Sequence, residues 1–270
     1  MADACVRHHA LRRASTVRVS QRVFFAVVAL VFAICAGLTI VWCMSMSTMP
    51  KLPMPGGWSL SMTWAPMCGQ KWPRVALSFV GMWIVMMVAM MLPSFAPVLW
   101  RYHEALGEAG EMGAHRLTAL AGVSYFFAWT VLGAIVFAFG FALIALAMRV
   151  PALSHALPVA SGVVVLVAGV SQFSAWKARY LACGRAAALH VARSASMQGV
   201  RLGVHCIACC AGLTAVLLVN GVMDLRTMTF VTLAISAERL ARAPERVAHA
   251  IGVLVVMFGL SMLARAFGFF

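Results

Sequence analysis

Charged residues are scarce in this chain. Only 10% of its 270 residues are Asp, Glu, Lys or Arg, whereas an ordinary soluble domain has about 25%. At the same time, 63% of the residues are hydrophobic. This combination excludes a water-soluble globular domain, because such a domain needs far more charge to cover its surface.

Acidic residues are the scarcest charged type, with 7 against 21 basic residues and a net charge of +14. Such an excess is also typical of nucleic-acid-binding proteins, but here the placement of the basic residues explains it. Seven spans with a cytoplasmic N-terminus would leave 15 of the 21 basic residues in the cytoplasm, five of them in the loop from Lys177 to Arg201. This asymmetry follows the positive-inside rule. We therefore expect membrane lipid as a partner, and no nucleic acid.

The chain also lacks a disulfide framework and a recognisable cleavage site. Its eight cysteines have no regular spacing, unlike those of a small secreted domain. The first apolar run, Val23 to Trp42, is longer than the 7 to 15 residues usual in a cleavable signal peptide. We interpret it as a signal anchor whose N-terminus is cytoplasmic.

Long uncharged runs recur along the chain. Each exceeds the roughly 20 residues that a helix needs to cross a bilayer; they are Val23 to Pro50, Val75 to Trp100, Leu117 to Met148, Val150 to Trp176 and Leu202 to Met223. Val247 to Ala264 adds a further span, and Thr227 to Ala237 is a short run that either spans or re-enters. The predicted fold class is an all-α, polytopic transmembrane helix bundle of about six to seven spans.

These runs divide the chain into five parts. They are a basic cytoplasmic tail (1–22), the signal-anchor span (23–42), a Met-rich outer loop (43–74), a metal-binding membrane helix bundle (75–264) and a C-terminal tail (265–270).

The segment His205-Cys206-Ile207-Ala208-Cys209-Cys210 is the most informative for function. Residues three and four apart share a helix face, so a helix here would gather the three thiols, with His205 stacked over Cys209. Thiolates suit Cu(I), or Zn(II) if a fourth ligand is supplied. The alternative is that the cysteines only pack as small hydrophobes. At the start of the fifth span, the cluster is expected 6 to 12 Å from the cytoplasmic edge at about 1.5 Å per residue.

Methionines form a second group of candidate ligands. Met86 and Met90, and likewise Met87 and Met91, are four residues apart and could present thioethers to one ligand. Such residues more often face lipid or fill gaps in a membrane than bind a metal. Pro93 follows them and is expected to kink the helix.

The outer loop is rich in sulfur, since Cys43, Cys68 and six methionines lie within 26 residues from Cys43 to Cys68. Thioethers bind Cu(I), so the loop could gather copper outside the membrane. A disulfide between Cys43 and Cys68 is an equally good use of the two thiols in an oxidising compartment.

Glu238 ends the short sixth run. A carboxylate at that depth is costly unless it is paired or functional. Pairing with Arg239, Arg242 or the segment around Lys177 is one reading, and metal ligation is the other.

At these residues the sequence resembles a bacterial family of predicted metal-binding integral membrane proteins. The matching stretches are MMVAMMLPSFAP (86–97), SQFSAWKARYLACGR (171–185) and GVHCIACCAGLTAVLLVNGVMDLRTM (203–228). The family's pattern falls on Met90, Met91, Pro93, Cys206, Cys209, Cys210, Gly221, Met223, Asp224 and Glu238. The chain departs from many relatives at Tyr180, Cys183 and Gly184, where they carry a second cysteine pair, and at Ala211, where they carry an aromatic residue.

One member of that family is a membrane copper chaperone for a tyrosinase-like oxidase, so the resemblance implies copper handling in the bacterial inner membrane. We predict a multi-pass Cu(I) chaperone or transfer protein that supplies a copper-dependent oxidase or another copper protein. The predicted ligands are Cys206, Cys209, Cys210, His205, Met90, Met91 and Glu238, and no catalytic residue is predicted. Three alternatives stay open: a thiol-disulfide oxidoreductase using the same cysteines, a metal transporter subunit, and a structural subunit.

Overall fold

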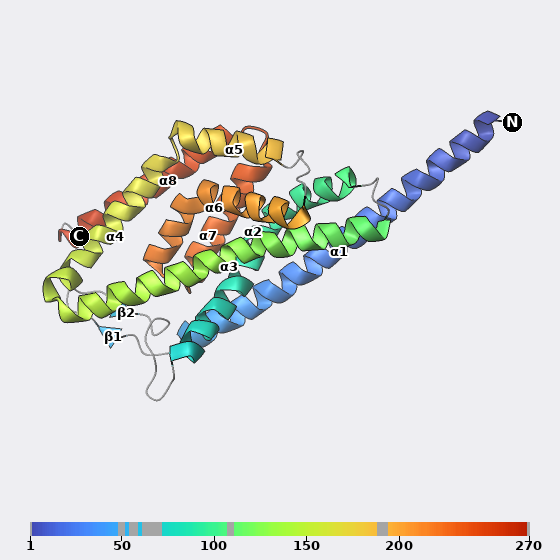
Figure 1. Cartoon of the computed structure of the whole chain (residues 1–270). Helices are drawn as coiled ribbons and strands as arrows, with labels where there is room; N and C mark the ends of the chain where they lie inside the picture. The colour runs from blue at the N-terminus through green and yellow to red at the C-terminus, as the bar shows by residue number, and fades with distance from the viewer. Residues whose placement is uncertain are drawn as a thin grey trace.

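The computed structural model describes residues 2–47, 52–53, 59–60, 72–106, 111–187 and 194–268. The described residues form a helix bundle with one very short β pairing (Figure 1). The elements are α1 (Ala2–Ser47), β1 (Leu52–Pro53), β2 (Ser59–Leu60), α2 (Trp72–Ala105), α3 (Glu111–Arg149), α4 (Pro151–Ser171), α5 (Ala175–Ala187), α6 (Ala195–Asn220), α7 (Leu225–Leu240) and α8 (Pro244–Ala266). β1 and β2 pair antiparallel, Leu52 opposite Leu60. The predicted all-α bundle is confirmed.

Six of the described helices are long and apolar enough to cross a membrane. The spanning segments are Ser20–Met46, Pro73–Ala105, Gly113–Arg149, Ala152–Ser171, Ala195–Asn220 and Pro244–Ala266. The short run expected at 227–237 lies in α7, which has 16 residues and is about 24 Å long at 1.5 Å per residue. α7 carries the chain from the end of α6 back to the start of α8.

Three helices fix the depth of the site. α2 runs antiparallel to α3, because Phe79 packs on Phe137 at 5.1 Å between ring centroids and Phe95 stacks on Tyr125 at 3.8 Å. α6 runs parallel to α3, because Gly199 lies against Ala121 and Gly203 against Tyr125. The middle portions of the three helices therefore lie at one level.

A glycine allows α3 and α6 to pack closely. A Cβ on Gly203 would lie 2.8 Å from the Cβ of Ala128 and 2.9 Å from the carbonyl oxygen of Tyr125, so no larger residue fits without moving a helix. Small residues at such contacts are common between membrane helices. Large apolar side chains on the outside of the bundle, such as Val123, Phe139 and Leu233, are 65–69% exposed and form a surface suited to lipid.

α7 begins at Asp224, which caps the helix. Its carboxylate accepts hydrogen bonds from the backbone N–H groups of Arg226 (3.3 Å) and Thr227 (3.2 Å) and from the Thr227 hydroxyl (2.6 Å). Burial raises the pKa of Asp224, but these hydrogen bonds outweigh it and bring the pKa below its ordinary value.

The prediction of a cytoplasmic loop from Lys177 to Arg201 was wrong in part. Residues 175–187 form α5, and α6 begins at Ala195. Lys177 is only 6% exposed, because it is paired with Glu238 inside the bundle. Lys177 therefore has a partner inside the bundle, and it should not be counted among the basic residues that indicate the cytoplasmic side.

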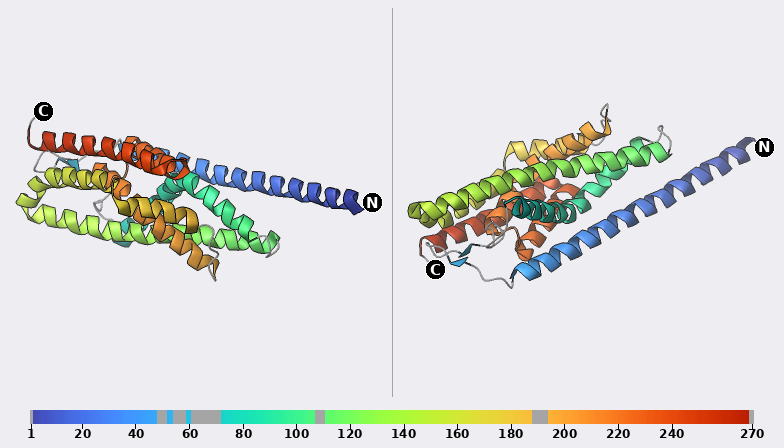
Figure 2. Two further views of the ribbon diagram at one scale, coloured as in Figure 1. Left: turned by 90° about the horizontal axis from the view of Figure 1, so that it is seen from above. Right: turned by 60° about the horizontal axis from the view of Figure 1, so that its bottom comes forward.

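The two ends of the chain lie at opposite ends of the bundle (Figures 1 and 2). α1 lies beside α2 and extends well past the other helices at its N-terminal side (Figure 2). We call the end of the bundle where α1 finishes, at Ser47, and α2 begins, at Trp72, the Cys43 end. α6 finishes at this same end, since Cys43 contacts Met223 just beyond it.

Candidate metal centre

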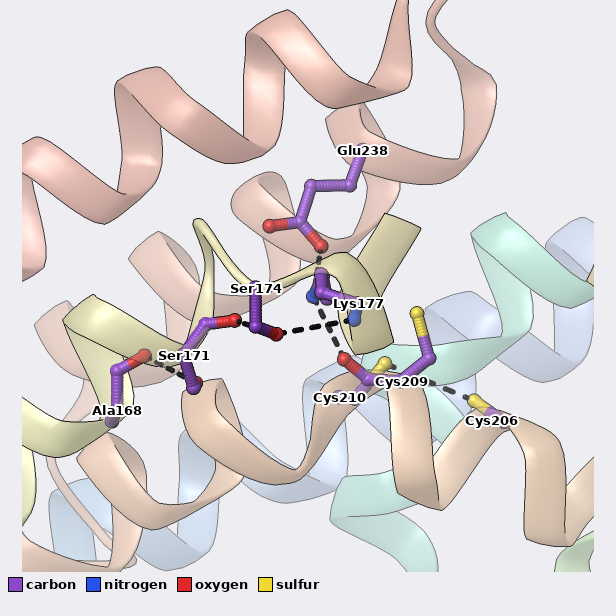
Figure 3. A network of polar contacts seen from close by, with 8 residues as sticks. All are labelled: Ala168, Ser171, Ser174, Lys177, Cys206, Cys209, Cys210 and Glu238. Atoms are coloured by element: carbon purple, nitrogen blue, oxygen red, sulfur yellow. Dashed lines mark hydrogen bonds and ion pairs between the residues drawn. The ribbon is translucent and has the colours of Figure 1, made fainter. Parts of the chain in front are cut away.

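Three buried thiols lie on α6. Cys206, Cys209 and Cys210 are 0%, 5% and 1% exposed. The sulfurs of Cys206 and Cys210 are 4.0 Å apart (Figure 3), as expected for residues four apart on a regular helix. All three are free thiols. The clustering predicted from the sequence is therefore found for Cys206 and Cys210.

α6 begins earlier than the fifth uncharged run predicted, whereas the depth of the thiols in the membrane stays a prediction. α6 begins after Ser194, whose hydroxyl accepts a hydrogen bond from the N–H of Met197. This start precedes the uncharged run by several residues, because the exposed Arg201 is part of the helix. Cys206 is thus about 17 Å from the start of α6 at 1.5 Å per residue, near the middle of the helix.

Side chains from α3 and α7 surround the Cys206 sulfur. The Tyr125 hydroxyl donates a hydrogen bond to it at 2.9 Å. The indole N–H of Trp129 faces it, without completing a hydrogen bond to any described residue. The guanidinium of Arg239 interacts electrostatically with Cys206 and Cys210. Donors and a cation are the groups that stabilise a thiolate, which is the form of cysteine that binds metals.

Cys209 connects the sulfur pair with a groove. It precedes Cys210 on α6, and it is among the residues that line a cavity of about 340 Å³ between α4, α5 and α6. Apolar residues form most of the wall, with Gln172 and Lys177 among the polar ones. Cys209 is therefore the one of the three cysteines that borders an open space.

A buried ion pair holds α5, α6 and α7 together behind the thiols (Figure 3). The Lys177 ammonium lies 2.7 Å from Glu238 Oε2 and donates to the carbonyl oxygen of Cys209 at 2.7 Å. The two side chains are 7% and 1% exposed. The pairing offered for Glu238 from the sequence is confirmed, whereas metal ligation by Glu238 stays a prediction. Its second oxygen, Oε1, has no hydrogen-bond partner in the described part of the chain.

The remaining predicted ligands lie nearby in different surroundings. The half-buried ring of His205 packs against Tyr180 of α5, 5.5 Å between centroids. Met90 and Met91 of α2 are 2% and 0% exposed, in the same core as the cysteines. They lie along α2 between Trp83, which donates to the Trp129 carbonyl at 2.9 Å, and Phe95, which stacks on Tyr125. The methionines are thus level with the thiols.

Within the described ranges, no three His, Cys, Asp or Glu side chains come together closely enough to hold a metal ion. Of the predicted ligands, Cys206 and Cys210 are a pair whose sulfur atoms lie 4.0 Å apart.

Sequence reasoning missed the residues that surround the sulfur pair. Tyr125 and Trp129 are four apart in an apolar run, a spacing that places two polar aromatic tips on one helix face. That spacing was the available signal. For Arg239 there was none beyond its place next to Glu238.

The fold and the thiols define the class: a multi-span membrane protein with a buried thiol pair. The PpoB2 family model, described as copper chaperone, matches residues 80–262, and the chain belongs to this family. This confirms the resemblance found in the sequence. No curated protein and no solved structure matches the chain.

Proposed function

We propose that the protein holds Cu(I) at Cys206 and Cys210 and passes it to a copper enzyme. The observation that carries the proposal is the buried pair of thiol sulfurs 4.0 Å apart. Two metal–sulfur bonds of about 2.3 Å each span at most about 4.6 Å. The pair can therefore bind one ion without moving the helix backbone.

A charge count favours a singly charged ion. Two thiolates and one Cu(I) carry a net charge of −1, which the neighbouring Arg239 offsets. With a doubly charged ion such as Zn(II), the two thiolates, the ion and Arg239 together would carry a net charge of +1. Unbalanced charge is costly in an apolar interior. Lys177 and Glu238 already neutralise each other. Zn(II) also favours four ligands, more than the thiol pair supplies.

Transfer would proceed by ligand exchange through Cys209. Cys209 is next to Cys210 in α6 and lines the groove between α4, α5 and α6. An incoming ligand in the groove could replace the thiolates one at a time, with no change in the oxidation state of copper. The recipient would be a copper-dependent oxidase or another copper protein of the bacterial inner membrane.

The test is Cu(I) binding by the full chain, purified in detergent and kept anaerobic. Wild type is compared with Cys206→Ser and Cys210→Ser, and with Cys35→Ser, a half-buried cysteine of α1, as the matched control. We expect Cys206→Ser and Cys210→Ser each to weaken Cu(I) binding at least 100-fold against a competing chelator, and Cys35→Ser to leave it unchanged. Unchanged affinity in both site variants would refute the proposal.

The thiol-disulfide oxidoreductase remains the alternative. It requires the Cys206 and Cys210 sulfurs to close from 4.0 Å to about 2.05 Å, and it requires an electron acceptor. If wild type binds no Cu(I) but its two thiols are oxidised reversibly by a quinone, this alternative is the better account.

A further inference from the structure

A second group of sulfur atoms lies at the Cys43 end of the bundle. The thiol of Cys43, in α1, contacts the thioether sulfur of Met223 at 3.6 Å and that of Met228 at 3.9 Å. Met223 lies in the turn after α6, and Met228 lies in the first turns of α7. Cys43 and Met228 are 3% and 5% exposed. Three separate elements thus bring three soft donor atoms to one buried point.

The spacing of these atoms suits a single metal ion. Both sulfur–sulfur distances are shorter than the roughly 4.6 Å that two metal–sulfur bonds of about 2.3 Å can span. One thiolate with two thioethers is a soft donor set, which selects Cu(I) over harder ions.

Charge near the group also favours a cation. The carboxylate of Asp224 is close enough to Cys43 to interact with it electrostatically. Hydrogen bonds from Thr227 and from the start of α7 hold that carboxylate in place. A Cu(I) ion bound to the Cys43 thiolate would form a neutral unit beside this fixed negative charge.

We propose that Cys43, Met223 and Met228 form a second Cu(I) site. On binding, Cys43 releases its proton to solvent, one copper–thiolate bond forms, and no electron is transferred. The proposal takes the ion from the function proposed above, but it rests on different residues. The last thiol of the first site, Cys210, and the end of α6 at Asn220 are about 15 Å apart along the helix. The two sites would hold copper about halfway along α6 and at one end of the same bundle.

The site is tested in a chain from which the first site has been removed. The background is the triple variant Cys206→Ser, Cys209→Ser, Cys210→Ser of the full chain, with Cu(I) as the probe and a chelator that outcompetes scattered thioethers. We expect two Cu(I) per wild-type chain, one per triple variant, and none after Cys43→Ser is added. Met223→Leu and Met228→Leu should each weaken the remaining ion at least tenfold, because leucine keeps the volume and removes the sulfur.

Each control variant carries the same type of substitution as a site variant, at a residue outside the proposed site. Cys35→Ser on α1 and Met197→Leu, an exposed methionine of α6, should leave the remaining ion bound. Copper absorption spectra of the triple variant should show sulfur ligands only, and thermal unfolding of each variant checks that it is folded.

The outcomes separate the two proposals. If wild type binds one ion and the triple variant none, the second site is overturned and the first stands. If the triple variant keeps the single ion of wild type and Cys43→Ser removes it, the second site is supported and the first fails. Copper that survives Cys43→Ser in the triple variant overturns the second site, and Cys43 is then an ordinary packed thiol.

Discussion

The hydroxyl group of Tyr125 is the closest hydrogen-bond donor to the Cys206 sulfur, at 2.9 Å. Tyr125→Phe removes this donor and keeps the ring that stacks on Phe95. Hydrogen bonds to charged groups are worth about 1.5 to 3 kcal/mol, and about 1.4 kcal/mol is tenfold in affinity. We expect Cu(I) affinity to fall about tenfold or more in a chelator competition.

Tyr180→Phe is the matched control, because the Tyr180 ring contacts His205 and not the sulfur pair. It should leave Cu(I) affinity unchanged. An equal loss in both variants would mean that Tyr125 acts only through packing.

Lys177 is expected to matter for stability because it neutralises Glu238. Lys177→Met leaves a carboxylate that is 1% exposed without its ion-pair partner, and breaking a buried pair in this way costs about 3 to 5 kcal/mol. We expect a marked drop in the thermal unfolding temperature in detergent. The double change Lys177→Met with Glu238→Leu should recover much of it, since no charge is then left unpaired.

Arg201→Met serves as the control, since Arg201 is exposed on α6. It should change the unfolding temperature little. A double variant as unstable as Lys177→Met alone would contradict the explanation by charge pairing.

Of the candidate site, only the part within one helix could be predicted from the sequence. The spacing of Cys206 and Cys210 follows from helix geometry alone, and the structure brings them together. Tyr125 and Arg239 come from other helices, and helix periodicity does not say which faces meet. The sulfur contacts of Cys43 were missed for the same reason. Its proposed disulfide partner, Cys68, lies outside the described residues, so that pairing stays a prediction.

At the scale of elements, the contact between α3 and α6 determines the position of Tyr125 relative to the thiols. Gly203→Ala would place a methyl group 2.9 Å from the Tyr125 carbonyl oxygen and push the helices apart. Overpacking of this kind costs about 1 to 3 kcal/mol. We expect a lower unfolding temperature together with weaker Cu(I) binding.

Gly81→Ala in α2 is the comparison, because nothing lies within 4 Å of the added methyl group. It should leave both properties unchanged. If Gly203→Ala destabilises the protein but leaves Cu(I) affinity intact, the α3–α6 spacing is not what positions the donor.

Element boundaries were predictable where uncharged runs are long and hard to predict where charge is buried. The spans from Val75 and Leu117 follow directly from hydropathy. Hydropathy did not predict α5, because Lys177 and its basic neighbours are typical of a surface loop. Only the partner, more than fifty residues later at Glu238, explains why a lysine lies inside the bundle.

For the whole molecule, the topology depends on α7. Six crossings would return the C-terminus to the side of the N-terminus, whereas α7 acting as a seventh places the two termini on opposite sides. The structure has the ends of the chain at opposite ends of the bundle. Together with the cytoplasmic N-terminus predicted from the basic residues, this arrangement leads us to expect that a fluorescent protein fused at the N-terminus and alkaline phosphatase fused at the C-terminus are both active in bacteria.

The same pair of fusions, exchanged between the termini, should both be inactive. Activity of one reporter at both termini would show that α7 re-enters and does not cross.

The Lys177–Glu238 pair also constrains how the protein is made. A lysine inside a membrane protein is costly unless it is paired, and Lys177 leaves the ribosome long before Glu238. α5 would then wait at the membrane surface until α7 has been synthesised, and enter the bundle together with it. The surroundings of the thiol pair would be completed only in that last step of biosynthesis, because Arg239 arrives with α7.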